Sequence, residues 1–185
     1  MREDIDPKTR LVDGNATFRR MTDPAVLSSL SKSHEPFVAI LTCSDARIDP
    51  AKVFSLSVGD AFVVRTAGNT ATDPCVIGSL EYAVEHLRVK ALLVLGHTGC
   101  GAIKATYDCC KPGNLDGVLR EIESAKSRLG VSESKDPTAV AVSNVRMVLR
   151  KLSDTSVTIR DAVAKDRLEM FGAVLDIENG TVEFI

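Results

Sequence analysis

The feature that most constrains this chain is an apolar run that leads directly into a histidine and a cysteine. Residues 91–95 are uniformly apolar, and Gly96, His97 and Cys100 follow them. Such a run is typical of a strand that is buried on both faces of a sheet. The loop after the strand lies at its carboxyl end, where His97 and Cys100 can direct an imidazole nitrogen and a sulfur toward one point. The pair therefore predicts half of a metal site, and this combination of ligands suits zinc.

A second apolar run, residues 37–41, ends in a similar loop. Cys43, Asp45 and Arg47 follow it at alternate positions. Cys43 would add a third ligand to the histidine and the cysteine, and a site with three protein ligands leaves a fourth position open, as in catalytic zinc. The guanidinium of Arg47 can hold the Asp45 carboxylate through two parallel hydrogen bonds. We expect Asp45 to ligate zinc only in a closed state, after Arg47 releases it, and water to bind there otherwise.

Strand-like and helix-like segments alternate along most of the chain. The expected strands are residues 37–41, 61–64, 91–95 and 172–177, and a turn at 178–180 leads to a last strand at 181–185. The expected helices are residues 6–21, a short helix after 22–24, helices that begin at Asp49-Pro50 and Asp73-Pro74, residues 102–107, 115–129, a helix from Asp136-Pro137, and residues 156–169. This order predicts an α/β fold with a central, mostly parallel sheet flanked by helices. The terminal hairpin would add an antiparallel edge.

The chain divides into an N-terminal helical arm, residues 1–35, and an α/β catalytic domain, residues 36–185. The apolar stripe of the arm is thin for a helix packed on its own domain. Two interpretations remain open, a frayed arm and an arm that packs on a partner subunit. In the α/β domain the ligand-bearing loops all follow strands, and ligands in such folds bind beyond the carboxyl ends of the strands.

Composition excludes several classes of function. With a net charge of −2 and no basic runs, the chain has no feature of a nucleic-acid-binding protein. Its apolar runs are far shorter than the about 20 residues that a membrane span needs. The acidic, polar start does not resemble a signal peptide, so we expect a cytoplasmic protein. An odd number of cysteines, five in all, then favours metal binding or free thiols over a disulfide framework.

Less specific interpretations of the cysteines also exist. A lone buried cysteine usually packs as a small apolar side chain. Cys109 and Cys110 could instead contribute to a structural zinc site with four ligands, although this pair follows an expected helix rather than a strand.

Two motifs carry a resemblance to a known family. Residues 43–47 (Cys-Ser-Asp-Ala-Arg) and 96–101 (Gly-His-Thr-Gly-Cys-Gly) are similar to the corresponding motifs of β-class carbonic anhydrases, with weaker matches at 64–69, 79–83 and 172–177. The resemblance implies one zinc ion per subunit, held by Cys43, His97 and Cys100. It also implies that Asp45 and Arg47 form the gating and catalytic pair. The family's functional unit is a homodimer in which N-terminal helices embrace the partner, and dimers can assemble further into tetramers.

The resemblance is closest to the plant-type branch of that family. It implies a substrate pocket lined by Phe62, Ala67, Gly101 and, from the neighbouring subunit, Tyr82. The sequence departs from the branch at His34, where the branch has a glutamine that helps to hold bicarbonate, and at Thr66, which replaces an asparagine. A histidine can still donate a hydrogen bond, so His34 stays a candidate pocket residue.

The expected activity is the reversible hydration of carbon dioxide to bicarbonate and a proton, by zinc-bound hydroxide that Asp45 and Arg47 orient. One alternative is hydrolysis of carbonyl sulfide or carbon disulfide at the same site. Another is a catalytically silent zinc-binding module that acts in assembly. The intact pair of Asp45 and Arg47 argues against a silent module, because a purely structural zinc site needs neither residue.

Overall fold

The computed structural model describes residues 6–108 and 113–185, so Cys109 and Cys110 and the alternative that involves them lie outside the described residues. The chain forms two compact units, which divide between His34 and Glu35. Within the described residues, no helix combines the length and the apolar character needed to cross a membrane.

The first unit consists of two helices, α1 (Pro7–Met21) and α2 (Pro24–Leu30). Each begins with an aspartate cap followed by proline: Asp6 accepts a hydrogen bond from the Thr9 amide at 2.9 Å, and Asp23 accepts one from the Ala25 amide at 2.8 Å. Both signals are typical of a helix start. No residue of either helix is fully buried, and most of the large apolar side chains are exposed: Leu11, Val12, Phe18, Met21 and Val26.

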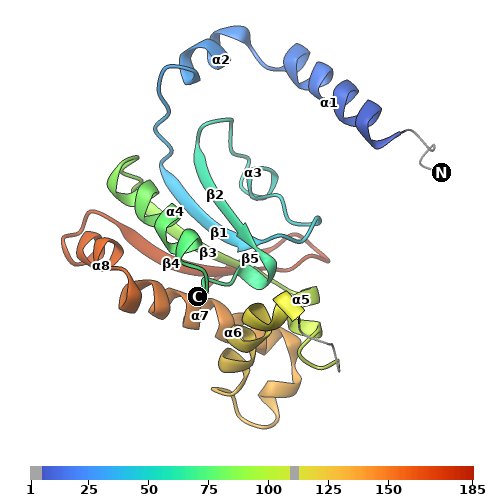
Figure 1. The fold of residues 1–185 in the computed structure, drawn as a ribbon, viewed down its shortest axis with the longest axis vertical. Coiled ribbons are helices and arrows are strands. Elements are labelled where there is room, and N and C mark those ends of the chain that lie inside the picture. The colour runs from blue at the N-terminus through green and yellow to red at the C-terminus, as the bar shows by residue number, and fades with distance from the viewer. Residues whose placement is uncertain (1–5, 109–112) are drawn as a thin grey trace. The chain divides into compact units, whose positions relative to one another are not determined.

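The second unit is built on one five-stranded sheet (Figure 1). Its strands are β1 (Val38–Cys43), β2 (Ala61–Thr66), β3 (Ala91–His97), β4 (Glu169–Leu175) and β5 (Val182–Phe184). They lie in the order β2-β1-β3-β4-β5. All neighbouring pairs are parallel except β4 and β5, which form the terminal hairpin. The predicted sheet with an antiparallel edge is thus confirmed.

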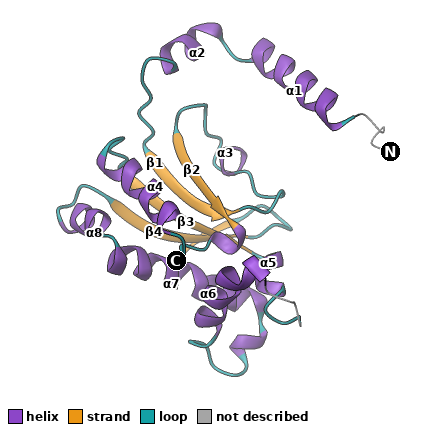
Figure 2. Cartoon of the chain, viewed as in Figure 1, coloured by secondary structure: helices purple, strands orange, loops and turns teal. Residues whose placement is uncertain are grey.

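Helices cover the sheet and its carboxyl end (Figure 2). They are α3 (Pro50–Val53), α4 (Pro74–Glu85), α5 (Gly101–Lys104), α6 (Asp116–Lys126), α7 (Pro137–Thr155) and α8 (Val157–Ala164), with short 3₁₀ turns η1 (Ala67–Asn69), η2 (Gly113–Leu115) and η3 (Glu133–Lys135). Helices α4, α7 and α8 pack on one face through buried side chains such as Leu80, Val145 and Ile159. Residues in and around α3, including Ile48 and Phe54, pack on the other face.

The last helix is shorter than the sequence pattern predicts, and the strand after it is longer. The expected helix 156–169 ends at Ala164, and β4 begins at Glu169 rather than at Gly172. Asp166 has a φ of 53°, and a left-handed residue just past the last turn is a common way to end a helix. Glu169 then pairs with Ala91, so hydrogen bonding to β3 extends the strand toward its start.

Candidate metal centre

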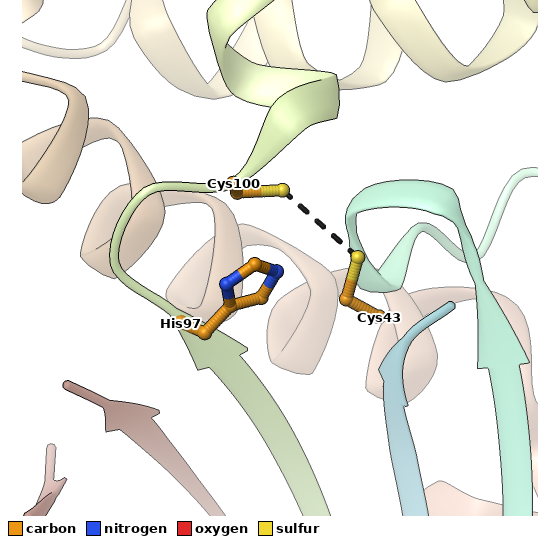
Figure 3. Close-up of side chains that lie close together, drawn as sticks. All are labelled: Cys43, His97 and Cys100. Atoms are coloured by element: carbon orange, nitrogen blue, oxygen red, sulfur yellow. Dashed lines mark hydrogen bonds between the residues drawn. The ribbon is translucent and has the colours of Figure 1, made fainter. Parts of the chain in front are cut away.

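Cys43, His97 and Cys100 meet at the carboxyl ends of two adjacent strands. Cys43 is the last residue of β1, His97 is the last residue of β3, and Cys100 immediately precedes α5. Because β1 and β3 are parallel neighbours, both loops emerge at the same edge of the sheet. The three side chains point toward one another, and their ligand atoms lie within 4.8 Å of each other (Figure 3). The structure therefore brings together the three residues that the sequence selected.

The spacing of the two sulfurs fits zinc. The Sγ atoms of Cys43 and Cys100 are 4.0 Å apart. Two sulfurs at about 2.3 Å from a tetrahedral zinc ion would lie about 3.8 Å apart, whereas a disulfide requires about 2.05 Å. The observed separation matches a pair of thiolate ligands and excludes a disulfide.

The orientation of His97 also fits. Its Nδ1 donates a hydrogen bond to the Thr98 carbonyl at 2.8 Å, and its Nε2 is buried without a hydrogen-bond partner among the described residues. Histidine ligands of metals usually donate from one ring nitrogen to a carbonyl, which fixes the ring and leaves the other nitrogen free to bind. The buried, unpartnered Nε2 and the two neighbouring sulfurs together form a set of donor atoms that suits zinc.

The electrostatics of the centre favour a thiolate at Cys43. The contact with the Cys100 thiol lowers the pKa of Cys43 to about 4, against the opposing effect of burial, and the Gly68 amide also donates to Cys43 Sγ at 3.3 Å. The same contact, together with burial, raises the pKa of Cys100. Burial lowers the pKa of His97, but the Cys43 sulfur, the Thr98 carbonyl and the Asp45 carboxylate together raise it by more, and the net shift is upward. A bound dication would compensate for ionising both sulfurs.

Asp45 and Arg47 form a two-pronged ion pair on the loop after β1. Arg47 Nε donates to Asp45 Oδ1 at 2.9 Å, and Arg47 Nη2 donates to Asp45 Oδ2 at 2.7 Å. The backbone amide of Arg47 adds a third hydrogen bond to Oδ1, at 2.9 Å. These contacts hold the pKa of Asp45 well below its usual range, so the carboxylate is ionised. Arg47 Nη2 also donates to the Gly99 carbonyl at 2.9 Å, which connects this loop to the ligand loop after β3.

Arg65 supports the loop after β1, a role that the sequence analysis does not predict. Its guanidinium, at the end of β2, donates to the carbonyl oxygens of Cys43, Asp45 and Ile48 at 3.1, 2.7 and 2.8 Å. One side chain thereby satisfies three carbonyls of a loop that forms no regular structure. The sequence signal that could have indicated this role is an arginine placed directly after the apolar run 61–64.

The expected pocket residues are found in different surroundings. The rings of Phe62 and Tyr82 pack within one chain, with centroids 6.2 Å apart. Ala67 begins the turn η1, and Gly101 is the exposed residue directly after Cys100. His34 is exposed and belongs to the first unit, whereas the other four residues belong to the second.

The sequence matches characterised proteins along most of its length. A family model described as carbonic anhydrase matches residues 38–182. A carbonic anhydrase of Mycolicibacterium smegmatis is 32% identical over 187 residues, which cover 94% of this chain and 89% of the relative. A carbonic anhydrase of Pseudomonas aeruginosa is 31% identical, over 94% of this chain and 85% of the relative.

Solved structures share the fold. One is from a study of two tetrameric β-carbonic anhydrases of Sordaria macrospora, with a TM-score of 0.84 and 27% identity, over 96% of this chain and 95% of that chain. A β-carbonic anhydrase of Coccomyxa in complex with acetazolamide has a TM-score of 0.81 and 26% identity, over 99% of this chain and 86% of that chain.

Proposed function

The chain belongs to the β-carbonic anhydrase family, and on this premise we propose that it uses zinc to catalyse the reversible hydration of carbon dioxide to bicarbonate and a proton. The observation that carries the proposal is the convergence of Cys43, His97 and Cys100, with the Asp45 carboxylate held by Arg47 on the adjoining loop. Three buried ligands and an ionised carboxylate are the parts that metal-assisted hydration requires.

Cys43, His97 and Cys100 would hold the ion and leave one coordination position open. When bound, zinc supplies Lewis acidity that lowers the pKa of water from about 15.7 to roughly 7 and so provides a nucleophile near neutral pH. The two thiolates offset much of the charge of a dication. We therefore expect activity to need a more alkaline pH than it would with three histidine ligands.

Asp45 orients the nucleophile in this proposal. Its carboxylate accepts a hydrogen bond from the attacking O–H group and so directs an oxygen lone pair toward carbon dioxide. Arg47 keeps the carboxylate ionised and holds it in place through both oxygens. If Arg47 released it, Asp45 would be free to take the open coordination position and close the site. The arrangement with both hydrogen bonds formed thus corresponds to the open state.

The substrate is small and uncharged, and apolar side chains suit it. Phe62 and Ala67, on β2 and the turn that follows it, would provide that surface, with Gly101 directly after Cys100. Tyr82 would extend the pocket from the neighbouring subunit, and His34 would help to hold bicarbonate. Carbonyl sulfide and carbon disulfide are also small and uncharged, so hydrolysis of either is the main alternative at this site.

The direct test measures carbon dioxide hydration by stopped flow between about pH 6.5 and 9, where the nucleophile forms. Protein that contains stoichiometric zinc should hydrate carbon dioxide faster than it hydrolyses carbonyl sulfide or carbon disulfide under matched conditions. The opposite preference would establish the alternative. Full zinc loading with no turnover of any of the three substrates would support a silent zinc-binding module.

We also propose that residues 1–35 pack on a partner subunit in a homodimer, which can assemble further into tetramers. The exposure of Leu11, Val12, Phe18 and Met21 supports this proposal, as does the tetrameric state named for the Sordaria relatives. Light scattering should find a dimer or a larger assembly for the full chain and a smaller species for Leu11→Asp/Phe18→Asp. An unchanged mass would exclude the arm from the interface.

The predicted cellular location of the protein is the cytoplasm.

A further inference from the structure

We propose that Glu121 and Asn144 are positioning residues for Cys43, because they fix the turn whose Gly68 amide donates to the Cys43 sulfur. The inference rests on the proposed function and deepens it, since Cys43 is one of the proposed zinc ligands. Within the described residues, neither side chain forms a hydrogen bond to Cys43, His97 or Cys100. Each contacts the turn that follows β2, residues 67–71.

The turn has an unusual backbone that the surrounding structure must hold in place. Gly68 and Asn69 are both left-handed, with φ values of 66° and 47°. A Cβ atom on Gly68 would lie 2.8 Å from Cδ1 of Ile122 and 3.2 Å from Cβ of Ala102, so the turn is closely packed against α5 and α6. A backbone of this kind persists only where several contacts determine it.

Glu121 provides one of those contacts from α6. Its side chain is only 3% exposed, and Oε1 accepts a hydrogen bond from the Ala71 amide at 2.8 Å. Its other oxygen accepts from Lys151 Nζ on α7 at 2.7 Å. A buried carboxylate is costly unless it is paired and hydrogen-bonded, and here both conditions are met. An apolar side chain at this position could not accept a hydrogen bond from the turn.

Asn144 provides the second contact from α7. It is 1% exposed, and its Nδ2 donates to the Gly68 carbonyl at 2.9 Å. The turn is therefore held by Asn144 at the carbonyl of Gly68 and by Glu121 at the amide of Ala71. The amide of Gly68 itself faces Cys43 Sγ at 3.3 Å.

This hydrogen bond bears directly on metal binding. A backbone amide that donates to a ligand sulfur fixes the position of that sulfur and stabilises its lone pair. Partners that orient a metal ligand typically change metal affinity by 10–100-fold when they are removed. Loss of the Glu121 contact should therefore weaken metal binding indirectly, because it displaces the turn that positions the Gly68 amide against Cys43.

Two double variants isolate the hydrogen bond from the ion pair. Glu121→Gln/Lys151→Met keeps an oxygen acceptor for the Ala71 amide, whereas Glu121→Leu/Lys151→Met removes it. Both variants lose the negative charge of Glu121 and the positive charge of Lys151 together. Glu121 and Lys151 both line a cavity of about 710 Å³ between α6 and α7. Ser143→Ala is the matched control, because Ser143 Oγ joins α7 to α6 through the Ala125 carbonyl at 2.8 Å.

The readouts are the rate of zinc transfer to a chelator and the sulfur-to-metal charge-transfer band of the cobalt-substituted protein. With the acceptor removed, we expect zinc to leave about tenfold faster. The cobalt band should also shift to lower energy, because the thiolate lone pair is less stabilised. The glutamine double variant and Ser143→Ala should match the unmodified chain in both measurements.

Equal zinc loss and equal spectra for the two double variants would overturn the inference. Asn144→Ala provides a second route if the leucine variant does not fold: it should shift both readouts in the same direction, and behaviour identical to Ser143→Ala would count against the inference. An unmodified chain that binds no zinc would refute the proposed function instead, so the two failures are distinguishable.

Discussion

The two loops that form the metal centre differ in how much of each is exposed. The proposed ligands His97 and Cys100, at the end of β3 and in the loop after it, are 1% and 3% exposed. Cys43, at the end of β1, is 4% exposed, but the side chains of Asp45 and Arg47 in the loop after β1 are 16% and 54% exposed. The loop after β3 is suited to holding a metal in one geometry. The loop after β1 contributes one ligand and also presents a carboxylate where it can meet solvent and substrate.

The loops are also anchored by different means. Backbone pairing extends past the end of β3, where the Thr98 amide donates to the Leu175 carbonyl at 2.9 Å. Past β1 the Ser44 amide likewise donates to the Thr66 carbonyl at 2.9 Å, but the loop that follows is also held by side chains, with Arg65 on its carbonyls and Arg47 on its carboxylate. Side chains that hold a loop, such as Arg65 and Arg47, can be substituted without disrupting the hydrogen bonds of a strand. We infer that metal retention and catalytic rate can be altered separately by substitutions in the two loops.

The largest effect is expected at the loop after β3. His97→Ala removes the buried Nε2 donor, so the protein should purify with little zinc and show background hydration only. Metal analysis and stopped-flow assays measure both quantities. Cys75→Ser, at an exposed free cysteine, is the matched control and should retain zinc and activity. Full zinc content in His97→Ala would contradict the assignment of His97 as a ligand.

A smaller effect, of a different kind, is expected at Asp45. Asp45→Ala should keep stoichiometric zinc and lose about 10²–10³-fold in turnover, as when one preorganised hydrogen-bonding partner of a reacting oxygen is removed. The control is Asp49→Asn, which changes a neighbouring carboxylate that pairs with Lys52 at 3.3 Å. If Asp45→Ala lost zinc and activity in parallel, the proposed division between the two loops would be wrong.

Arg47→Lys should have an intermediate effect. Lysine keeps the positive charge but cannot donate two parallel hydrogen bonds, so Asp45 is held less firmly. We expect full zinc content and a loss of about 10–100-fold in turnover, as for other groups that orient a residue at a metal site. Arg120→Lys alters a similar ion pair, with Asp116 at 2.6 Å, and should leave turnover unchanged. A loss as large as that of Asp45→Ala would mean that lysine fails entirely to hold the carboxylate.

The sequence alone predicted that Cys43, His97 and Cys100 converge, because parallel strands bring their carboxyl ends to one edge of the sheet. It did not identify the residues that support them. Glu121 reaches a turn 50 residues away, and in the sequence it is one of several charged residues on an amphipathic helix. Arg65, likewise, contacts a loop that precedes it by about 20 residues. Such contacts depend on how helices and loops pack, which local patterns do not encode. The early end of α8 has a similar cause, because nothing local distinguishes the left-handed backbone of Asp166.

The smallest expected effect concerns the pH dependence of the loop after β1. Arg47 depresses the pKa of Asp45, so the ion pair's contribution to stability is complete above the usual aspartate pKa of about 3.9. It is lost only as the pH falls below that value and through the folded-state pKa. The stability difference between the unmodified chain and Asp45→Asn should therefore stay constant from about pH 7 to 5 and narrow below about pH 4.

Urea unfolding at a series of pH values measures this difference, and groups common to both proteins cancel from it. A difference that already narrows between pH 7 and 5 would show that Arg47 does not hold the carboxylate as the two hydrogen bonds indicate. A constant difference would also assign any change of hydration rate in that range to a group other than Asp45. The pH dependence of catalysis would then arise at the metal position, and the carboxylate of the loop after β1 would stay ionised throughout.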